Sequence, residues 1–343
     1  MGLPTPLSVR RNWGRNMALQ DNHDALLLDL DGTVWNGGVA IEHAVDAING
    51  SGLAAMYVTN NASRSAGDVA QMLNAIGLNT AEQDVITSAQ AALTMAESHL
   101  EHGDSVLVVG AASFKQLVSD AGYRVVASAD DNPKAVLHGH NPETGWAQLS
   151  EAALAIQQGA IYLATNLDTT LPMERGFMVG NGSMVAAVTS ATGVVPEAAG
   201  KPGPAMFLQA ADRLGAKRPL AVGDRLDTDI AGGVAAGIPA LHLLTGVSGP
   251  LALIEAPKEH RPTFIADDLR GLTQDAESLR PGAQGGFTAR IDGDDIILGN
   301  GNDAATPTEA LRTVLEVAWH MDTPPEYVRP NSEAAERATA QWW

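Results

Sequence analysis

Short apolar segments that end in polar residues alternate with helical segments along most of this chain. Residues 25–30 (ALLLDL) and 54–60 (AAMYVTN) have the length and composition of buried strands. Residues 40–52 have helical spacing and a glycine stop, and residues 65–78 form a second helical pattern that Ser65 can cap. A strand–helix–strand–helix order predicts parallel pairing in a doubly wound sheet of the α/β class.

The same alternation restarts further along the chain. Strand-like segments at 105–111, 134–140 and 160–166 are separated by helical ones, and two more follow at 218–224 and 239–246. The simplest account is a Rossmann-like sheet core that is interrupted by an inserted α/β domain, which we call the cap. The predicted division is a flexible N-terminal arm (1–23), a first core part (24–97), the cap (98–190), a second core part (191–275) and a C-terminal segment (276–343).

The C-terminal segment has a different pattern. Residues 281–303 predict a β-hairpin around an Asp-Gly turn, and residues 306–321 predict an amphipathic helix with Pro307 near its start. The polar residues 324–343 are expected to be partly disordered, although the paired tryptophans at their end can dock on a neighbouring surface. We expect this segment either to cover an edge of the core, to support a dimer or to be a decayed domain.

The charge balance limits the partners of the chain. Its 343 residues include 40 acidic and 21 basic ones, which gives a formal net charge of -19. Such a surface repels nucleic acid and anionic membranes, so we expect a small-molecule partner instead, with a homo-oligomer left open. The absence of cysteine excludes disulfides and thiolate metal sites.

No part of the sequence has the pattern of a membrane or export segment. No apolar run approaches the roughly 20 residues that a membrane-spanning helix needs. Arg10, Arg11 and Arg15 are not followed by an apolar segment, so we predict no signal peptide and a cytoplasmic location. Met17 is an alternative natural start.

Two aspartates stand at the end of the first apolar segment. Asp29 and Asp31 belong to the stretch DLDGT, whose pattern D-x-D-G-T occurs by chance at roughly one position in 10⁵. A plain strand exit followed by an Asp-Gly turn is the alternative interpretation. In parallel α/β sheets, ligands bind beyond the carboxyl ends of the strands, which is where we expect these carboxylates to lie.

Three further polar stretches offer groups for the same site. Residues 59–61 (TNN) offer a hydroxyl and amides for phosphate oxygens, and Lys201 in GKPGP offers a fixed cation. The stretch GDRLDTD contains Asp224, Asp227 and Asp229, whose carboxylates suit Mg²⁺. Each has an ordinary alternative: a polar strand exit, an exposed lysine in a turn or a solvated acidic loop. Their expected convergence at one edge of the sheet favours a single site.

These residue types together predict phosphoryl chemistry. A carboxylate such as Asp29 can attack a phosphate monoester and form an aspartyl-phosphate, which divides one difficult step into two. Asp31 is placed to protonate the leaving alkoxide and then to deprotonate a water molecule. Because Mg²⁺ near Asp29 and Asp224 offsets the repulsion between two anions, we predict a magnesium cofactor.

Taken in order, DLDGT, TNN, GKPGP and GDRLDTD resemble the four motifs of the haloacid dehalogenase-like phosphatases, over roughly residues 24–275. The insertion resembles the large α/β (type IIA) cap of the subgroup that contains 4-nitrophenyl phosphatases and phosphoglycolate phosphatases. The C-terminal segment adds a resemblance to actinobacterial glycerol 3-phosphate phosphatases.

This resemblance implies a role for each motif residue. It implies Asp29 as nucleophile and metal ligand, and Asp31 as general acid and base that also ligates the metal through its carbonyl. It implies Asp224 as a magnesium ligand and Asp229 as a support for that metal site. The implied phosphate-binding residues are Thr59, Asn60, Asn61 and Lys201.

Two cap stretches, 164–172 and 179–187, also resemble this subgroup and supply candidates for contacts with the substrate. These candidates are Asn166, Asp168, Gly180, Asn181, Gly182 and Ser183. Val179 stands where family members often have proline, and the family pattern leads us to expect an aspartate near His140. His138 and His140 have the spacing of zinc ligands, but two histidines at a strand end are more often structural.

We therefore expect a Mg²⁺-dependent phosphomonoester hydrolase whose cap closes over small metabolites and excludes bulky phosphoproteins. Glycerol 3-phosphate is the first candidate substrate, ahead of 2-phosphoglycolate, sugar phosphates and the test compound 4-nitrophenyl phosphate. Two alternatives stay open: a phosphotransferase or mutase on the same scaffold, and a non-catalytic protein that binds a phosphorylated ligand.

Overall fold

The structure, a computed structural model, describes residues 17–173, 175–340 and 342. The predicted flexible arm up to residue 16 lies outside them. The rest of that arm is packed rather than flexible. Leu19–Asn22 form a 3₁₀ turn, and the Leu19 N–H donates to the Gln274 carbonyl over 2.8 Å. Leu19 is fully buried in the apolar core, which accounts for the order of this part.

The core is a six-stranded sheet in the order β15-β14-β13-β1-β4-β5, and every neighbouring pair is parallel. This confirms the predicted doubly wound α/β core. Its strands are β1 (Ala25–Leu28), β4 (Ala54–Thr59), β5 (Val85–Thr87), β13 (Pro219–Gly223), β14 (Ala240–Leu243) and β15 (Phe264–Ala266).

Helices cover both faces of the core sheet. They are α1 (Ala44–Ser51), α2 (Ala66–Ala75), α3 (Ser88–Glu97), α7 (Ala205–Leu214), α8 (Ala231–Ala235) and α9 (Pro250–Ile254). Successive side chains of a strand point to opposite faces. Accordingly, Leu26 and Leu28 of β1 share a buried cluster with residues of α1 and α2, whereas Leu27 shares one with residues of α3 and α7. As predicted, Ser65 caps α2 by accepting from the Asp68 N–H.

The cap is a second parallel sheet, in the order β12-β9-β8-β6-β7. Its strands are β6 (Ser105–Val109), β7 (Arg124–Val126), β8 (Ala135–His138), β9 (Ile161–Ala164) and β12 (Glu197–Ala198), and its helices are α4 (Ala112–Asp120), α5 (Trp146–Gln157) and α6 (Asn181–Thr192). The pairing of β12 with β9 extends this sheet beyond residue 190, where we expected the cap to end.

Two small hairpins lie outside the main sheets. One consists of β2 (Trp35–Asn36) and β3 (Val39–Ala40), directly after the DLDGT stretch. The other consists of β10 (Thr170–Met173) and β11 (Gly176–Val179) in the cap. Val179 pairs with Thr170 in an ordinary antiparallel register, so the replacement of the proline expected there leaves a regular strand.

The C-terminal segment folds into a three-stranded sheet with two helices. Its elements are β16 (Phe287–Asp292), β17 (Asp295–Asn300), α10 (Pro307–Ala318), β18 (Val328–Pro330) and α11 (Glu333–Thr339). The hairpin and the first helix agree with prediction. The expected disorder of residues 324–343 is wrong for the part that the structure describes, because β18 pairs with β17 and Ser332 caps α11. Trp342 is buried, whereas Trp343 lies outside the described residues.

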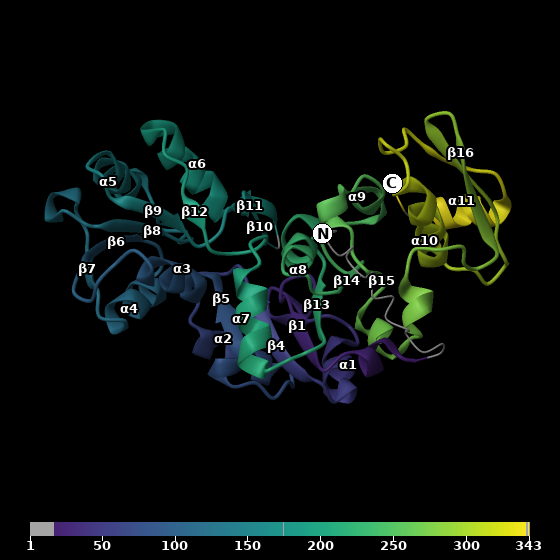
Figure 1. The fold of residues 1–343 in the computed structure, drawn as a ribbon, viewed down its shortest axis with the longest axis horizontal. Coiled ribbons are helices and arrows are strands. Elements are labelled where there is room, and N and C mark those ends of the chain that lie inside the picture. The colour runs from purple at the N-terminus through teal and green to yellow at the C-terminus, as the bar shows by residue number, and fades with distance from the viewer. Residues whose placement is uncertain (1–16, 174, 341, 343) are drawn as a thin grey trace, which may run out of the picture.

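The C-terminal segment packs along the β15 edge of the core sheet. Arg312 of α10 is buried, and its guanidinium donates to the Ile265 carbonyl of β15 over 3.0 and 2.5 Å. The Trp319 indole N–H donates to the Leu253 carbonyl over 2.9 Å. In Figure 1 the cap and the C-terminal segment lie at opposite ends of the molecule, with the core between them. No helix in the described part of the chain has the length and apolarity needed to cross a bilayer.

Candidate active site

The predicted motif residues meet at the carboxyl ends of three adjacent core strands. Asp29 directly follows β1, Thr59 ends β4, and Asp224 directly follows β13. Because β13, β1 and β4 are neighbours and parallel, their ends lie side by side at one edge of the sheet. This is the place where ligands bind in open α/β sheets.

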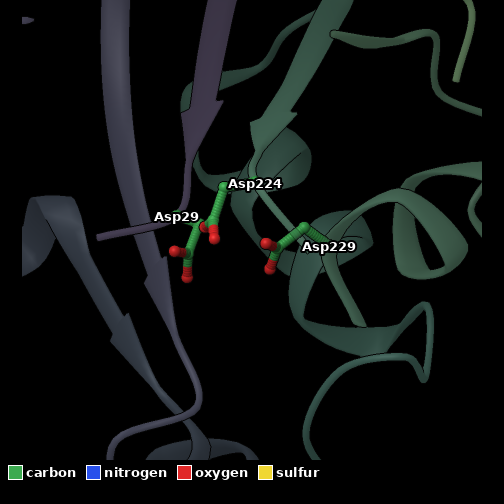
Figure 2. Close-up of side chains that lie close together, drawn as sticks. All are labelled: Asp29, Asp224 and Asp229. Atoms are coloured by element: carbon green, nitrogen blue, oxygen red, sulfur yellow. The ribbon is translucent and has the colours of Figure 1, made fainter. Parts of the chain in front are cut away.

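Three carboxylates form a compact cluster at this edge. One oxygen atom of each of Asp29, Asp224 and Asp229 lies within 4.8 Å of the others. Figure 2 shows the three side chains converging from the ends of two neighbouring strands and from the turn that follows. That turn, the π-helical stretch Leu226–Ile230, brings Asp229 back toward β1. Gly32 is required beside the cluster, since its φ is +92° and an added Cβ would lie 2.5 Å from the Asp224 carboxylate.

Lys201 is the cation within this cluster. Its Nζ lies 2.5 Å from Asp29 Oδ1 and 2.6 Å from Asp229 Oδ1, and it also donates to the Val58 carbonyl over 3.0 Å. The side chain is almost fully buried. Burial alone would lower the pKa of Lys201, but the charges of Asp229 and Asp29 outweigh it and raise that pKa, so the lysine stays charged.

One lysine does not balance the buried carboxylates. Burial, followed by the charge of Asp229, raises the pKa of Asp29 well above its ordinary value despite the ion pair with Lys201. Burial and the same neighbour raise the pKa of Asp224 to about 7. The site therefore favours an additional cation. Clustered carboxylate oxygens are the ligands that Mg²⁺ prefers, and it needs only one or two of them because it keeps several waters, so the residues fit this ion.

The TNN stretch connects the core to the lysine loop. Asn60 Oδ1 accepts from the Lys201 backbone N–H over 2.9 Å, and Asn60 Nδ2 donates to the Lys201 carbonyl over 3.1 Å. Thr59 Oγ1 accepts from the Asn61 N–H over 3.1 Å. These bonds hold the turn after β4 against Lys201, and Thr59, Asn60 and Asn61 all line the cavity beside the carboxylates.

Asp31 lies apart from the three clustered carboxylates, on the same cavity. The residue as a whole is exposed, and its Oδ1 accepts from the Trp35 indole N–H over 3.0 Å. The cavity walls shield the carboxyl from bulk water and raise the pKa of Asp31, while the bond from Trp35 opposes this rise.

Cap residues close the other end of the cavity, which has a volume of about 110 Å³. Asn60 Nδ2 donates to both oxygens of Asp168 over 3.2 and 3.1 Å, and Asn166 Nδ2 donates to the Asn60 carbonyl over 2.7 Å. Gly180 and Asn181 also line the cavity. The volume is far below the roughly 300–1,000 Å³ typical of drug-sized ligand sites, so the cavity suits a small metabolite.

Two predicted substrate contacts lie outside the cavity lining. The Gly182 N–H donates to the Asp168 carbonyl over 2.8 Å, and Ser183 Oγ donates to the Thr169 carbonyl over 2.7 Å. These residues therefore hold the loop that carries Asp168.

The third aspartate of the GDRLDTD stretch does not join the carboxylate cluster. Asp227 is exposed and pairs with Arg225 over 3.1 Å.

The two cap histidines have the surroundings of histidines with a structural role rather than those of zinc ligands. His138 is fully buried, its Nδ1 lies 2.9 Å from the Tyr162 hydroxyl, and burial lowers its pKa to about 4. His140 Nδ1 lies 3.2 Å from Ser63 Oγ, and burial lowers its pKa as well. Among the described residues, neither histidine belongs to a group of possible metal ligands.

The sequence did not indicate several other residues of the lining. They are Ala62, Ser63, Thr170, Leu171, Arg225, Thr228 and Val247, and His140, which was considered only as a possible zinc ligand, lines the cavity as well. Arg225 carried the clearest signal, because it directly follows Asp224 within the GDRLDTD stretch. The hairpin residues Thr170 and Leu171 lie in the stretch 164–172 that resembles the subgroup, but their approach to the core depends on how the cap is placed.

Known proteins resemble both halves of the core. A family model described as haloacid dehalogenase-like hydrolase matches residues 26–124, and a HAD-hydrolase-like model matches residues 198–272. The chain is 40% identical to the D-glycerol 3-phosphate phosphatase of Mycobacterium tuberculosis over 336 residues, which is 95% of each protein. It is 34% identical to the acid sugar phosphatase of Staphylococcus epidermidis over 254 residues, 72% of this chain and 96% of that protein.

Solved structures agree with these matches. The glycerol phosphate phosphatase of M. tuberculosis in complex with magnesium superposes with a TM-score of 0.88 at 40% identity, covering 95% of this chain and 98% of that one. The p-nitrophenyl phosphatase of Archaeoglobus fulgidus superposes with a TM-score of 0.67 at 26% identity, covering 74% and 98%. The chain therefore belongs to the haloacid dehalogenase-like hydrolases, as a magnesium-dependent phosphatase with an inserted α/β cap.

Proposed function

We propose that this phosphatase hydrolyses glycerol 3-phosphate to glycerol and inorganic phosphate. The observation that carries the proposal is the 40% identity over 95% of both chains with a protein named D-glycerol 3-phosphate phosphatase. That match is long enough to include most of the C-terminal segment as well as the core and the cap. The small cavity, with amides and a carboxylate at its cap end, supports a short polar leaving group.

We further propose how the motif residues divide the reaction. A carboxylate oxygen of Asp29 attacks phosphorus and forms an aspartyl-phosphate, while Asp31 gives its proton to the departing alkoxide. Asp31 then takes a proton from a water molecule, which attacks phosphorus, releases phosphate and restores the Asp29 carboxylate. Lys201, whose ammonium lies 2.5 Å from Asp29, favours the ionised form of this nucleophile against the effect of burial and neutralises charge on the phosphoryl group.

The remaining residues hold the metal and the substrate. We assign magnesium to Asp29, Asp224 and the Asp31 carbonyl, with Asp229 orienting Lys201 and supporting the metal site. Bound Mg²⁺ supplies positive charge that offsets the repulsion between the carboxylate and the phosphate. Thr59, Asn60 and Asn61 bind phosphate oxygens in this proposal, and the cap residues Asn166, Asp168, Gly180 and Asn181 contact the alcohol part of the substrate.

Phosphate release from a panel of small phosphomonoesters, with and without Mg²⁺, tests the proposal. We expect Mg²⁺-dependent hydrolysis with the highest kcat/KM for glycerol 3-phosphate, and glycerol and phosphate in equal amounts. Less free phosphate than glycerol would instead indicate transfer to another acceptor, the phosphotransferase or mutase alternative. Binding of the ester without turnover would indicate the non-catalytic alternative.

Three further predictions stay open to simple measurements. Light scattering tests the proposed homo-oligomer, and limited proteolysis tests the proposed division into arm, core parts, cap and C-terminal segment. Cell fractionation tests the cytoplasmic location.

A further inference from the structure

The loop after β14 lies outside the four sequence motifs, yet it wraps around Asp224. Residues 244–249 connect β14 to α9, and we call them the β14 loop. The Val247 N–H donates to Asp224 Oδ2 over 2.7 Å, and the Ser248 N–H donates to the Asp224 backbone carbonyl over 3.1 Å. Gly246 lies so close that an added Cβ would overlap the Asp224 carboxylate. The loop therefore holds both the side chain and the main chain of this aspartate.

Both carboxylate oxygens of Asp224 have a donor from the protein. Thr33 Oγ1 donates to Oδ1 over 3.3 Å, while the Val247 N–H binds Oδ2. The aspartate is fully buried. Two donors restrict the rotation of a buried carboxylate, and each of its oxygens keeps a lone pair for a cation. The protein itself thus fixes the orientation of this carboxylate.

Ser248 also fixes the turn that brings Asp229 to the carboxylate cluster. Its Oγ accepts from the Leu226 N–H over 3.1 Å, at the first residue of the π-helical stretch. The same turn is held by the Arg225 N–H, which donates to Asp229 Oδ2 over 3.0 Å. Ser248 therefore links Asp224 to the turn that carries Asp229.

A buried histidine of β14 holds Ser248 in turn. His242 is fully buried, and its Nε2 lies 2.9 Å from the Ser248 carbonyl. A carbonyl oxygen can only accept, so the ring donates through Nε2–H, and its Nδ1 has no hydrogen-bond partner in the described part of the chain. The strand that carries His242 is paired on both sides, with β13 and β15. The β14 loop is thus supported by a rigid element of the sheet.

The β14 loop reaches the end of β1 as well. Thr245 Oγ1 donates to the Gly32 carbonyl over 2.6 Å, and the Gly32 N–H donates to the Trp35 carbonyl over 2.8 Å. These two bonds act on both sides of Gly32, directly beside the Asp31 carbonyl that we assign to the metal. A carbonyl keeps its direction only if its peptide plane is fixed, because the peptide unit is planar. Thr245 therefore connects the strand end of β1 to the loop that holds Asp224.

We propose, on the basis of the metal assignment made above, that the β14 loop positions the magnesium ligands, with Thr245 and Ser248 as positioning residues. Neither residue binds the metal or the substrate. Both act through Asp224 and the Asp31 carbonyl. Residues that orient metal ligands in this way commonly contribute about 10- to 100-fold to metal affinity. The β14 loop does not touch the Asp29 carboxylate, so its effect falls on metal binding rather than on the attack at phosphorus.

Isothermal titration calorimetry with Mg²⁺, in the absence of substrate, compares the native full-length protein with Ser248→Ala and Thr245→Val. We expect the Kd for Mg²⁺ to rise about tenfold or more in Ser248→Ala and about 3- to 10-fold in Thr245→Val. The Mg²⁺ concentration that gives half the maximal rate with 4-nitrophenyl phosphate should rise by similar factors. The kcat at saturating Mg²⁺ should stay within about threefold of the native value, because the reacting groups are unchanged.

Two further variants separate positioning from a general loss of stability. Thr263→Val is the matched control for Thr245→Val, since Thr263 Oγ1 accepts from the Ala240 N–H over 3.3 Å at the opposite end of the same strand. It should lower the temperature of unfolding without changing the Kd for Mg²⁺. Ser248→Thr keeps a hydroxyl at its position and should keep this Kd within about threefold of the native value.

The outcomes separate this inference from the function on which it rests. An unchanged Kd for Mg²⁺ in folded Ser248→Ala and Thr245→Val would overturn the inference, and so would an equal rise in Thr263→Val. Thr245→Val decides by itself if Ser248→Ala does not fold. A native protein that binds Mg²⁺ but releases phosphate from no ester would overturn the proposed function, and calorimetry would still decide the inference because it needs no turnover.

Discussion

The two ends of the cavity are built in different ways. At the core end, carboxylates at the ends of two adjacent strands, β1 and β13, and in the turn after β13 surround Lys201 from the loop after β12, as in the 2.5 Å contact between Lys201 and Asp29. At the cap end, a loop and a hairpin supply mostly neutral side chains around Asp168. The edge of a sheet holds side-chain atoms rigidly enough for a chemical step, whereas the sequence and length of loops can differ from one related protein to another. This difference suggests that the core sets the reaction and the cap sets the substrate.

The largest expected effect separates the two ends. Asp29→Asn removes the nucleophile, so kcat should fall by roughly 10⁴-fold or more for every substrate, whereas Asp168→Asn should change activity about tenfold and in a substrate-dependent direction. Steady-state phosphate release measures both. Residual turnover of Asp29→Asn within about tenfold of the native rate would contradict the proposed mechanism. Unchanged thermal unfolding of the variant serves as the control for folding.

Each of the two sheets contains a buried histidine that should affect the stability of the protein at acid pH. His138 in the cap sheet and His242 in the core sheet are both fully buried, and burial lowers the pKa of each to about 4. Between pH 6.5 and 4 the unfolded chain binds protons that the folded chain does not. Each histidine should therefore contribute roughly 3 kcal/mol of stability that is complete above pH 6.5 and is lost as pH falls toward 4.

Substituting each histidine separates its contribution to the pH dependence of stability from the contributions of other titrating groups. The raised pKa values of Asp29 and Asp224 act in the opposite direction, but they are shared by the native protein and the variants His138→Asn and His242→Asn. The free energy of unfolding of each variant should consequently depend less on pH between 6.5 and 4 than that of the native protein. Parallel curves for variant and native protein would show that the histidine is not held neutral.

A smaller effect is expected from a residue that positions Asp31. The indole N–H of Trp35 donates to Asp31 Oδ1, so Trp35→Phe should let this carboxyl rotate away from the leaving group. We expect kcat to fall about tenfold for glycerol 3-phosphate, whose alkoxide needs a proton, and less than about twofold for 4-nitrophenyl phosphate, whose leaving group departs without one. Equal losses for both substrates would indicate a structural role alone.

The smallest expected effect is a dependence of substrate preference on the protonation of Asp168 at the cap end. Burial raises the pKa of Asp168, against the charge of Arg225, the bond from Asn60 and the charge of Lys201, while Asp229 adds to the rise. As pH falls through this raised pKa, the carboxyl becomes neutral and stops repelling anions. The rate for an anionic ester such as 2-phosphoglycolate should thus rise relative to that for glycerol 3-phosphate as pH is lowered through this raised pKa. A preference for glycerol 3-phosphate that grows on acidification would contradict this assignment.

The sequence predicted the core end well because its signals are local. Asp29 and Thr59 follow or end apolar runs, and parallel order alone brings such strand ends together. The cap end was predicted only in part. The bond from Asn60 to Asp168 joins residues 108 positions apart, and no local pattern indicates such a contact. The bond from the Gly182 N–H to the Asp168 carbonyl likewise depends on the folded loop rather than on a local pattern.

The C-terminal segment was misjudged for a related reason. Its last residues are polar and alanine-rich, which indicated partial disorder, yet Ser332 caps α11 and β18 adds to the hairpin. Ser332, the N-terminal capping residue of α11, could be recognised in the sequence. The burial of Trp342 was not, because it depends on neighbours from elsewhere in the fold.

The packing of α10 against β15 also has a consequence for folding during synthesis of the protein. The guanidinium of Arg312 occupies the Ile265 carbonyl, so the outer strand of the core sheet is not left open in the finished molecule. A ribosome releases β15 before it has synthesised α10. The nascent chain therefore passes through an interval in which a nearly complete sheet presents an unpaired border to other chains. Premature termination in the C-terminal segment would make that interval permanent, and the resulting fragments would be substrates for chaperones and proteases even though every catalytic group is present.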